Sequence, residues 1–177
     1  MLFCLCVLVG CGEKNEEARA TAPEAKVIPI FDSNDKNHVK IAREIGGTRE
    51  LTESDLEKVT ELGLHALELT DASVLSRLTQ LEKLSLWSNK LTDINALAGL
   101  KKLKYLEVMY NQLTNVSAVA KLTQLEDLIL EGNNLTDEQL KHLAGLAQLK
   151  ELSLAANSFT DVSAFSQSYP IEGAWPR

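Results

Sequence analysis

The strongest constraint in this sequence is a leucine pattern that recurs in five consecutive units. Each unit approximates LxxLxxLxLxxNxLTDxxxL, and the units begin at Leu56, Leu78, Leu100, Leu122 and Leu146, which are 22, 22, 22 and 24 residues apart. A unit of this length cannot bury its leucines alone, so consecutive units must stack and share one continuous core. The pattern therefore predicts a solenoid.

Alternation around two leucines of each unit predicts a short strand. Leu84 and Leu86 alternate with Lys83, Ser85 and Trp87. A strand turns both leucines inward and the other three side chains outward, because successive side chains point to opposite faces. Strands of successive units then pair in parallel, about 4.8 Å apart, along one face of the stack.

The repeat resembles the leucine-rich repeat, and its 22-residue form with LTDIxxL is similar to the class found in internalins and related bacterial surface proteins. The resemblance covers residues 56–167. It implies an α/β solenoid, a leucine-rich-repeat arc with parallel strands on the concave face, short helices or turns on the convex face and an N-terminal helical cap. As a class, it implies adhesion or recognition.

One asparagine recurs where the chain leaves each strand. Its side-chain amide can satisfy backbone groups of neighbouring coils that would otherwise be buried without partners. The first unit has Leu67 at this position, which fits a terminal coil with no repeat before it. We therefore predict a structural ladder of four asparagines: Asn89, Asn111, Asn133 and Asn157.

A Thr-Asp or Thr-Asn pair follows the asparagine in every unit, at 70–71, 92–93, 114–115, 136–137 and 160–161. One interpretation is a ladder of calcium ligands. The other is helix N-capping, in which a short oxygen-bearing side chain accepts free backbone N–H groups at the start of the convex turn. We favour capping.

Both ends of the solenoid need a cover, because a terminal coil exposes its leucines. Residues 27–55 are predicted to form the N-terminal cap, with one helix whose apolar face is Val39, Ile41, Ala42 and Ile45, and a second helix that begins at Thr52 with a capping box to Asp55. Residues 168–177 are predicted as the C-terminal cap or tail. The candidates to cover the last coil are Phe165, Tyr169 and Trp175.

The first residues predict export and a lipid anchor. Residues 1–10 contain an apolar run of roughly ten residues, about half the length that spans a bilayer. The run ends in Leu8-Val9-Gly10-Cys11, which resembles the bacterial lipobox, and this resemblance implies that Cys11 carries the lipid. No Lys or Arg precedes the run, so the true start can lie upstream, and a merely trimmed apolar N-terminus is the alternative.

Residues 11–26 have a charged, Ala-rich composition typical of a flexible tether. The predicted location is therefore the cell envelope, lipid-anchored in the outer membrane or on the surface of a bacterium. By resemblance to known sorting rules, Gly12 after the cysteine favours the outer membrane.

Composition argues against several functions. The net charge of −7 disfavours nucleic acid as a partner, since phosphate binding needs clustered Lys and Arg. All three cysteines lie in the first eleven residues, and His38, His65 and His142 fall in different parts of the predicted solenoid. We therefore expect no metal site, no cofactor and no enzyme activity.

The outward strand positions are the candidate binding site. Trp87 and Met109 occupy the same position on adjacent strands, and acidic residues surround them. An apolar centre with a charged rim is typical of a surface that binds a protein or peptide. The alternatives are ordinary exposed apolar residues and an envelope scaffold or spacer without a specific ligand. The predicted contact residues are Lys83, Trp87, Tyr105, Glu107, Met109, Tyr110, Ile129 and Glu131, and His65 is a weaker candidate.

Overall fold

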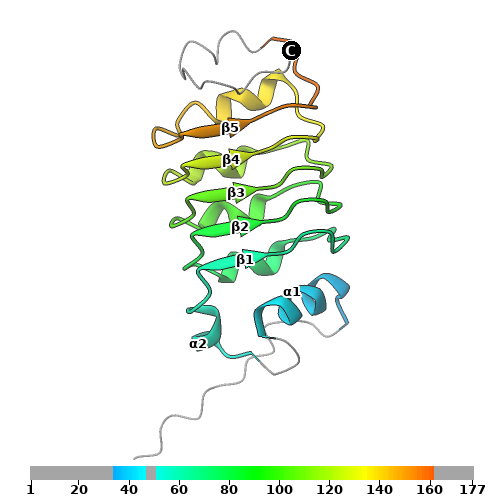
Figure 1. The fold of residues 1–177 in the computed structure, drawn as a ribbon, viewed down its shortest axis with the longest axis vertical. Helices are drawn as coiled ribbons and strands as arrows, with labels where there is room; N and C mark the ends of the chain where they lie inside the picture. The colour runs from blue at the N-terminus through cyan, green and yellow to red at the C-terminus, as the bar shows by residue number, and fades with distance from the viewer. Residues whose placement is uncertain (1–33, 47–50, 162–177) are drawn as a thin grey trace, which may run out of the picture.

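The computed structural model describes residues 34–46 and 51–161, and the predicted solenoid is confirmed within them. One parallel sheet holds five strands in chain order, and helical turns return behind it (Figure 1). The strands are β1 (Glu61–Gly63), β2 (Lys83–Ser85), β3 (Tyr105–Glu107), β4 (Asp127–Ile129) and β5 (Glu151–Ser153).

The leucine spacing sets the strand register. Leu62, Leu84, Leu106, Leu128 and Leu152 pair in sequence across the sheet, so one leucine of each coil lies directly above that of the coil before. The two side chains that end this row are 9% and 4% exposed, and the three inner ones are fully buried. The core is therefore a continuous column of leucine that runs through every coil.

The convex side consists of 3₁₀-helices: η1 (Ser73–Arg77), η2 (Asn95–Gly99), η3 (Ser117–Lys121) and η4 (Asp137–His142). A side-chain oxygen accepts a free backbone N–H at the start of each of the first three helices. Asp71, Asp93 and Asn115 each accept the N–H of the residue two positions on, at 3.1, 3.0 and 2.8 Å. Each of these residues precedes the true N-cap residue, which makes no side-chain cap bond. The capping hypothesis thus holds in the form of Asx-turns.

The fourth pair differs from the others. Asp137 accepts the backbone N–H of Thr160 at 2.8 Å and that of Asp161 at 3.2 Å, both from the next coil. The Thr160 hydroxyl also donates to the Asp137 carboxylate. This bond is the largest cause of the lowered pKa of that carboxyl group, and the two backbone bonds lower the pKa further. The longer fourth unit therefore uses this aspartate to join two coils.

Asparagine amides join the coils on the inside. The Asn111 amide nitrogen donates to the carbonyl oxygens of Leu86 in the previous coil, at 2.9 Å, and Val108 in its own coil, at 3.1 Å. Its amide oxygen accepts the N–H of Leu91 at 3.0 Å. Asn89, Asn133 and Asn157 make equivalent bonds with their own neighbours.

The N-terminal cap contains α1 (Lys36–Gly46) and α2 (Glu53–Leu56). In α1, Ile41 is fully buried and packs in the core, with Ala42 and Ile45 partly buried against it. Val39 is 38% exposed, so its predicted place on the apolar face is wrong. Since Val39 and Ile41 are separated by about 200° on a helix, one face cannot hold both.

Two sets of contacts fix the cap to the first coil. The Asn37 amide nitrogen donates to the Thr70 hydroxyl at 3.2 Å, and its amide oxygen accepts the Thr70 N–H at 3.0 Å. In addition, the Lys40 ammonium donates to the Leu67 carbonyl. The helix therefore binds backbone groups of the terminal coil that no earlier repeat could satisfy.

The capping box at α2 is present. The backbone N–H and the hydroxyl of Thr52 both donate to the Asp55 carboxylate, at 2.9 and 2.8 Å. Cys11 and the candidate terminal residues Phe165, Tyr169 and Trp175 lie outside the described residues. In the described ranges, no helix has the length and apolar character needed to cross a membrane.

Truncating a core leucine tests the register. Leu106→Ala removes a fully buried side chain from the central strand and should lower the free energy of unfolding by roughly 2–5 kcal/mol. Urea denaturation measures this loss. Ile129→Ala, which shortens an outward side chain on the neighbouring strand, is the control and should cost clearly less. Equal costs would contradict the inward orientation of Leu106.

Replacing a ladder asparagine tests the amide bonds. Asn111→Leu keeps the branching of the side chain but leaves the buried Leu91 N–H without its acceptor, so about 1–3 kcal/mol of stability should be lost. Gln112→Leu changes the next, exposed residue and should stay within about 0.5 kcal/mol. Chemical denaturation of both variants measures these losses. If the denaturation midpoint of Asn111→Leu equalled that of the native protein, the asparagine ladder would not stabilise the fold.

Candidate functional site

The outward side chains of the strands and of the residues that follow them form three rows across the concave face. The first row is Glu61, Lys83, Tyr105, Asp127 and Glu151. The second row is Gly63, Ser85, Glu107, Ile129 and Ser153. The third row is His65, Trp87, Met109, Glu131 and Ala155.

Backbone hydrogen bonds hold the third row in register beyond the strands. The N–H of Ala66 donates to the carbonyl of Trp87 at 3.0 Å, and that of Ser88 donates to Met109 at 3.0 Å. Corresponding bonds reach Glu131, at 2.8 Å, and Ala155, at 3.0 Å. The third row therefore keeps the same register along the stack as the strands do.

The third row begins with a stacked aromatic pair. The rings of His65 and Trp87 have centroids 5.4 Å apart and planes inclined by only 10°. Trp87 remains 37% exposed although one face of its indole is covered. Sequence reasoning placed Met109 beside Trp87 and gave His65 no structural partner. His65 and Trp87 are 22 residues apart, which is one repeat length, and this spacing could have predicted that they are neighbours.

Tyr110 follows Met109, the middle residue of this row, and has an unusual backbone conformation. Its φ is +53°, in the left-handed region that bulky residues seldom adopt. Its hydroxyl donates to a Glu131 carboxylate oxygen at 2.8 Å, and this bond raises the pKa of the phenol. The side chain is 49% exposed. The hydrogen bond to Glu131 therefore orients an aromatic ring that remains open to solvent.

Gly132 provides the space for that ring. A Cβ atom at Gly132 would lie 2.3 Å from Cδ1 of Tyr110, and the glycine φ of +66° is itself left-handed. Any larger residue would displace the tyrosine. Sequence reasoning missed Gly132, although it follows Tyr110 by one repeat length.

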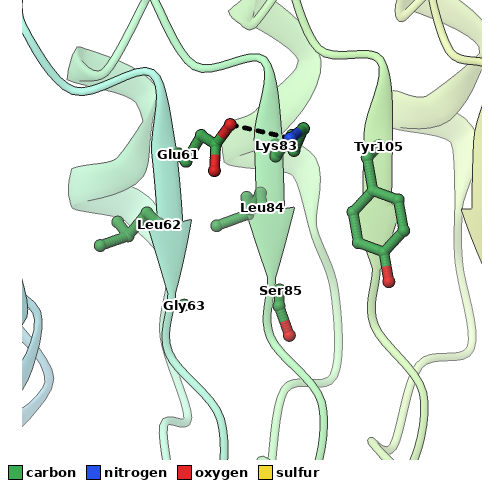
Figure 2. A pocket seen from close by; sticks show the side chains of 7 residues that line it. All are labelled: Glu61, Leu62, Gly63, Lys83, Leu84, Ser85 and Tyr105. Atoms are coloured by element: carbon green, nitrogen blue, oxygen red, sulfur yellow. Dashed lines mark ion pairs between the residues drawn. The ribbon is translucent and has the colours of Figure 1, made fainter.

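An open hollow of about 490 Å³ lies over the first two rows, and residues of β1, β2 and β3 line it (Figure 2). The Glu61 carboxylate and the Lys83 ammonium form an ion pair at 2.8 Å on one side. Gly63 contributes no side chain and Ser85 only a short one, which leaves room between this pair and the Tyr105 ring.

Carboxylates gather toward the later strands. Glu107 accepts a hydrogen bond from the Ser85 hydroxyl at 2.7 Å. Burial raises the pKa of the Tyr105 phenol, and so do the negative charges of Glu107, Asp127 and Glu151. These carboxylates therefore act together on one region of the surface.

One group of possible metal ligands occurs in the described residues, at the junction of the cap and the first coil. Ligand atoms of Asp35, His38 and Asp71 lie within 4.8 Å of one another, whereas the scatter of the three histidines led us to expect no metal site. Asp35 accepts the N–H of Asn37 at 2.7 Å, and Asp71 accepts the Ser73 hydroxyl at 2.6 Å. Turn formation accounts for both carboxylates.

A family model described as "Leucine Rich repeats (2 copies)" matches residues 79–121. No curated protein matches the chain.

Several solved structures share the fold. An internalin of Listeria monocytogenes, InlF, is 32% identical with a TM-score of 0.61, and the match covers 67% of this chain and 35% of that one. The functional domain of InlJ from the same organism is 31% identical with a TM-score of 0.64, covering 75% of this chain and 30% of that one. This chain thus spans about a third of their length.

A plant receptor gives a more distant match. The leucine-rich-repeat ectodomain of GASSHO1/SCHENGEN3 from Arabidopsis thaliana is 28% identical with a TM-score of 0.52, covering 62% of this chain and 14% of that one. That structure is a complex with CASPARIAN STRIP INTEGRITY FACTOR 2. The repeats, the strand register and these matches agree, and the chain is a leucine-rich-repeat protein similar to the internalins.

Proposed function

We propose that this protein is a non-enzymatic binding module that recognises a protein or peptide through its concave face. Leucine-rich-repeat domains typically serve as protein-interaction modules, because the stack presents an extended, regular surface. The main support for this proposal is the position of Trp87. Its indole is stacked on His65 yet still open to solvent, on the same face as a hollow and a group of carboxylates.

The physical reason is that pre-ordered aromatic side chains give up little conformational freedom on binding. Trp and Tyr are enriched among the residues that dominate protein interfaces. Here the stack orders Trp87, and the Glu131 hydrogen bond orders Tyr110. The ectodomain of GASSHO1/SCHENGEN3, solved in complex with a second molecule, supports a binding role for an arc of this kind.

We further propose that a lipid on Cys11 anchors the module in a bacterial cell envelope, in the outer membrane or on the cell surface. The support is the sequence alone: an apolar run, a lipobox-like Leu-Val-Gly-Cys and a charged tether before the cap. A tether of this kind would hold the concave face away from the membrane and leave it accessible.

The binding role is tested by affinity capture from bacterial envelope extracts with the native protein and a Trp87→Ser/Met109→Ser variant. A captured partner should bind the variant about thirtyfold more weakly, since truncated interface anchors cost roughly 2 kcal/mol. Val39→Ser is the control, because Val39 is 38% exposed on the cap helix, close to the 37% of Trp87. A protein that acts only as an envelope spacer would lose no partner through either change.

The lipid anchor is tested by Cys11→Ser. This change removes the thiol that would accept the lipid, so the protein should move from the membrane fraction to the soluble fraction. Cys4→Ser and Cys6→Ser alter the same segment without touching the acceptor and should leave the distribution unchanged. Membrane association that survives in Cys11→Ser would rule out this anchor.

A further inference from the structure

The three rows of the concave face divide by charge along the stack. In the first two coils, Glu61 is paired with Lys83 at 2.8 Å, and the third row is aromatic. In the last three coils, none of the residues that belong to the three rows is Lys or Arg. Instead they hold four carboxylates: Glu107, Asp127, Glu131 and Glu151.

The neighbouring lysines pair mainly with other carboxylates. Lys104 and Lys150 immediately precede β3 and β5, but Lys104 pairs with Glu82 at 2.7 Å and Lys150 with Glu126 at 2.5 Å. Both partners lie outside the three rows, and their pKa values are lowered by these bonds. Lys150 also interacts with Asp127, but the four carboxylates of the later coils still outnumber the basic groups beside them. Burial is the largest cause of the raised pKa of Tyr105, and three of these carboxylates raise it further.

We infer that the concave face binds an extended peptide segment that places an apolar or aromatic residue at the His65–Trp87 stack and Lys or Arg side chains at the carboxylates of the later coils. The inference rests on the proposed function and names its partner class. Charge complementarity selects the partner, because an acidic or neutral segment would leave four carboxylates without a counter-charge.

The spacing of the partner follows from the stack. Neighbouring coils are separated by about 4.8 Å, so Trp87 lies roughly 5 to 14 Å from the levels of the third, fourth and fifth coils. An extended peptide crossing the strands advances about 3.3 Å per residue and turns alternate side chains to the same side. Basic residues two and four positions from the anchor, about 7 and 13 Å away, therefore reach these carboxylates.

The test uses synthetic peptides of about twelve residues. The probe has a central Trp with Arg at positions −4, −2, +2 and +4, which serves either direction of the chain across the face. One control replaces the four arginines by Gln. A second moves them to −3, −1, +1 and +3, where an extended chain points them away from the surface.

Two protein variants complete the design. The face variant is Asp127→Asn/Glu131→Gln/Glu151→Gln. The matched variant, Glu44→Gln/Glu57→Gln/Glu138→Gln, removes the same charge from exposed positions outside the three rows. Fluorescence anisotropy with labelled peptides and the native chain gives the dissociation constants.

The native protein should bind the probe about tenfold more tightly than either control peptide, and raising salt should weaken the probe selectively. The face variant should lose this tenfold preference, whereas the matched variant should keep it. If both variants lost the preference for the probe equally, the net charge of the protein would explain that preference, and the inference would be overturned. Equal affinity for all peptides, or no binding of the probe, would overturn it as well.

The capture experiment separates this failure from that of the proposed function. If a captured partner still depends on Trp87 and Met109 while the peptides show no preference for arginine, the concave site stands and only its partner class is wrong. If capture is also unaffected by those substitutions, both proposals fail.

Discussion

The asparagine ladder is the interaction on which the structure depends. Stacked coils must turn sharply after each strand, and the turn buries main-chain groups that no strand partner can reach. The Leu86 carbonyl, for example, accepts from the amides of both Asn89 and Asn111 at 2.9 Å. Because an unsatisfied buried group costs about 1–3 kcal/mol, the leucine column could not close without these amides.

The same turn shapes the concave face. The residue before each ladder position has a left-handed φ, with values from +52° at Ala156 to +66° at Gly132. This conformation carries the chain off the sheet and directs the next side chain into the core. In the third coil it also holds Tyr110 at the rim. Backbone geometry required for stacking therefore places an exposed aromatic ring beside the concave face.

Function on this scaffold depends on what the core leaves free. Leucines and asparagines use the inward positions, so the outward rows can vary without loss of the fold. In this chain they carry a stacked His65–Trp87 pair in the first two coils and carboxylates in the later three. An ordered apolar region beside a charged one gives a face both an anchor and a means of selecting its partner.

The sequence by itself determined the repeat, the strand register and the inward leucines, because a period of 22 residues requires equivalent positions to stack. It also placed Trp87 outside the core. Only the tertiary structure decided that Trp87 stacks on His65, that Gly132 receives the Tyr110 ring and that Val39 is exposed. Periodicity specifies which residues share a row, whereas contacts between exposed side chains depend on rotamers and turn angles that no single repeat encodes.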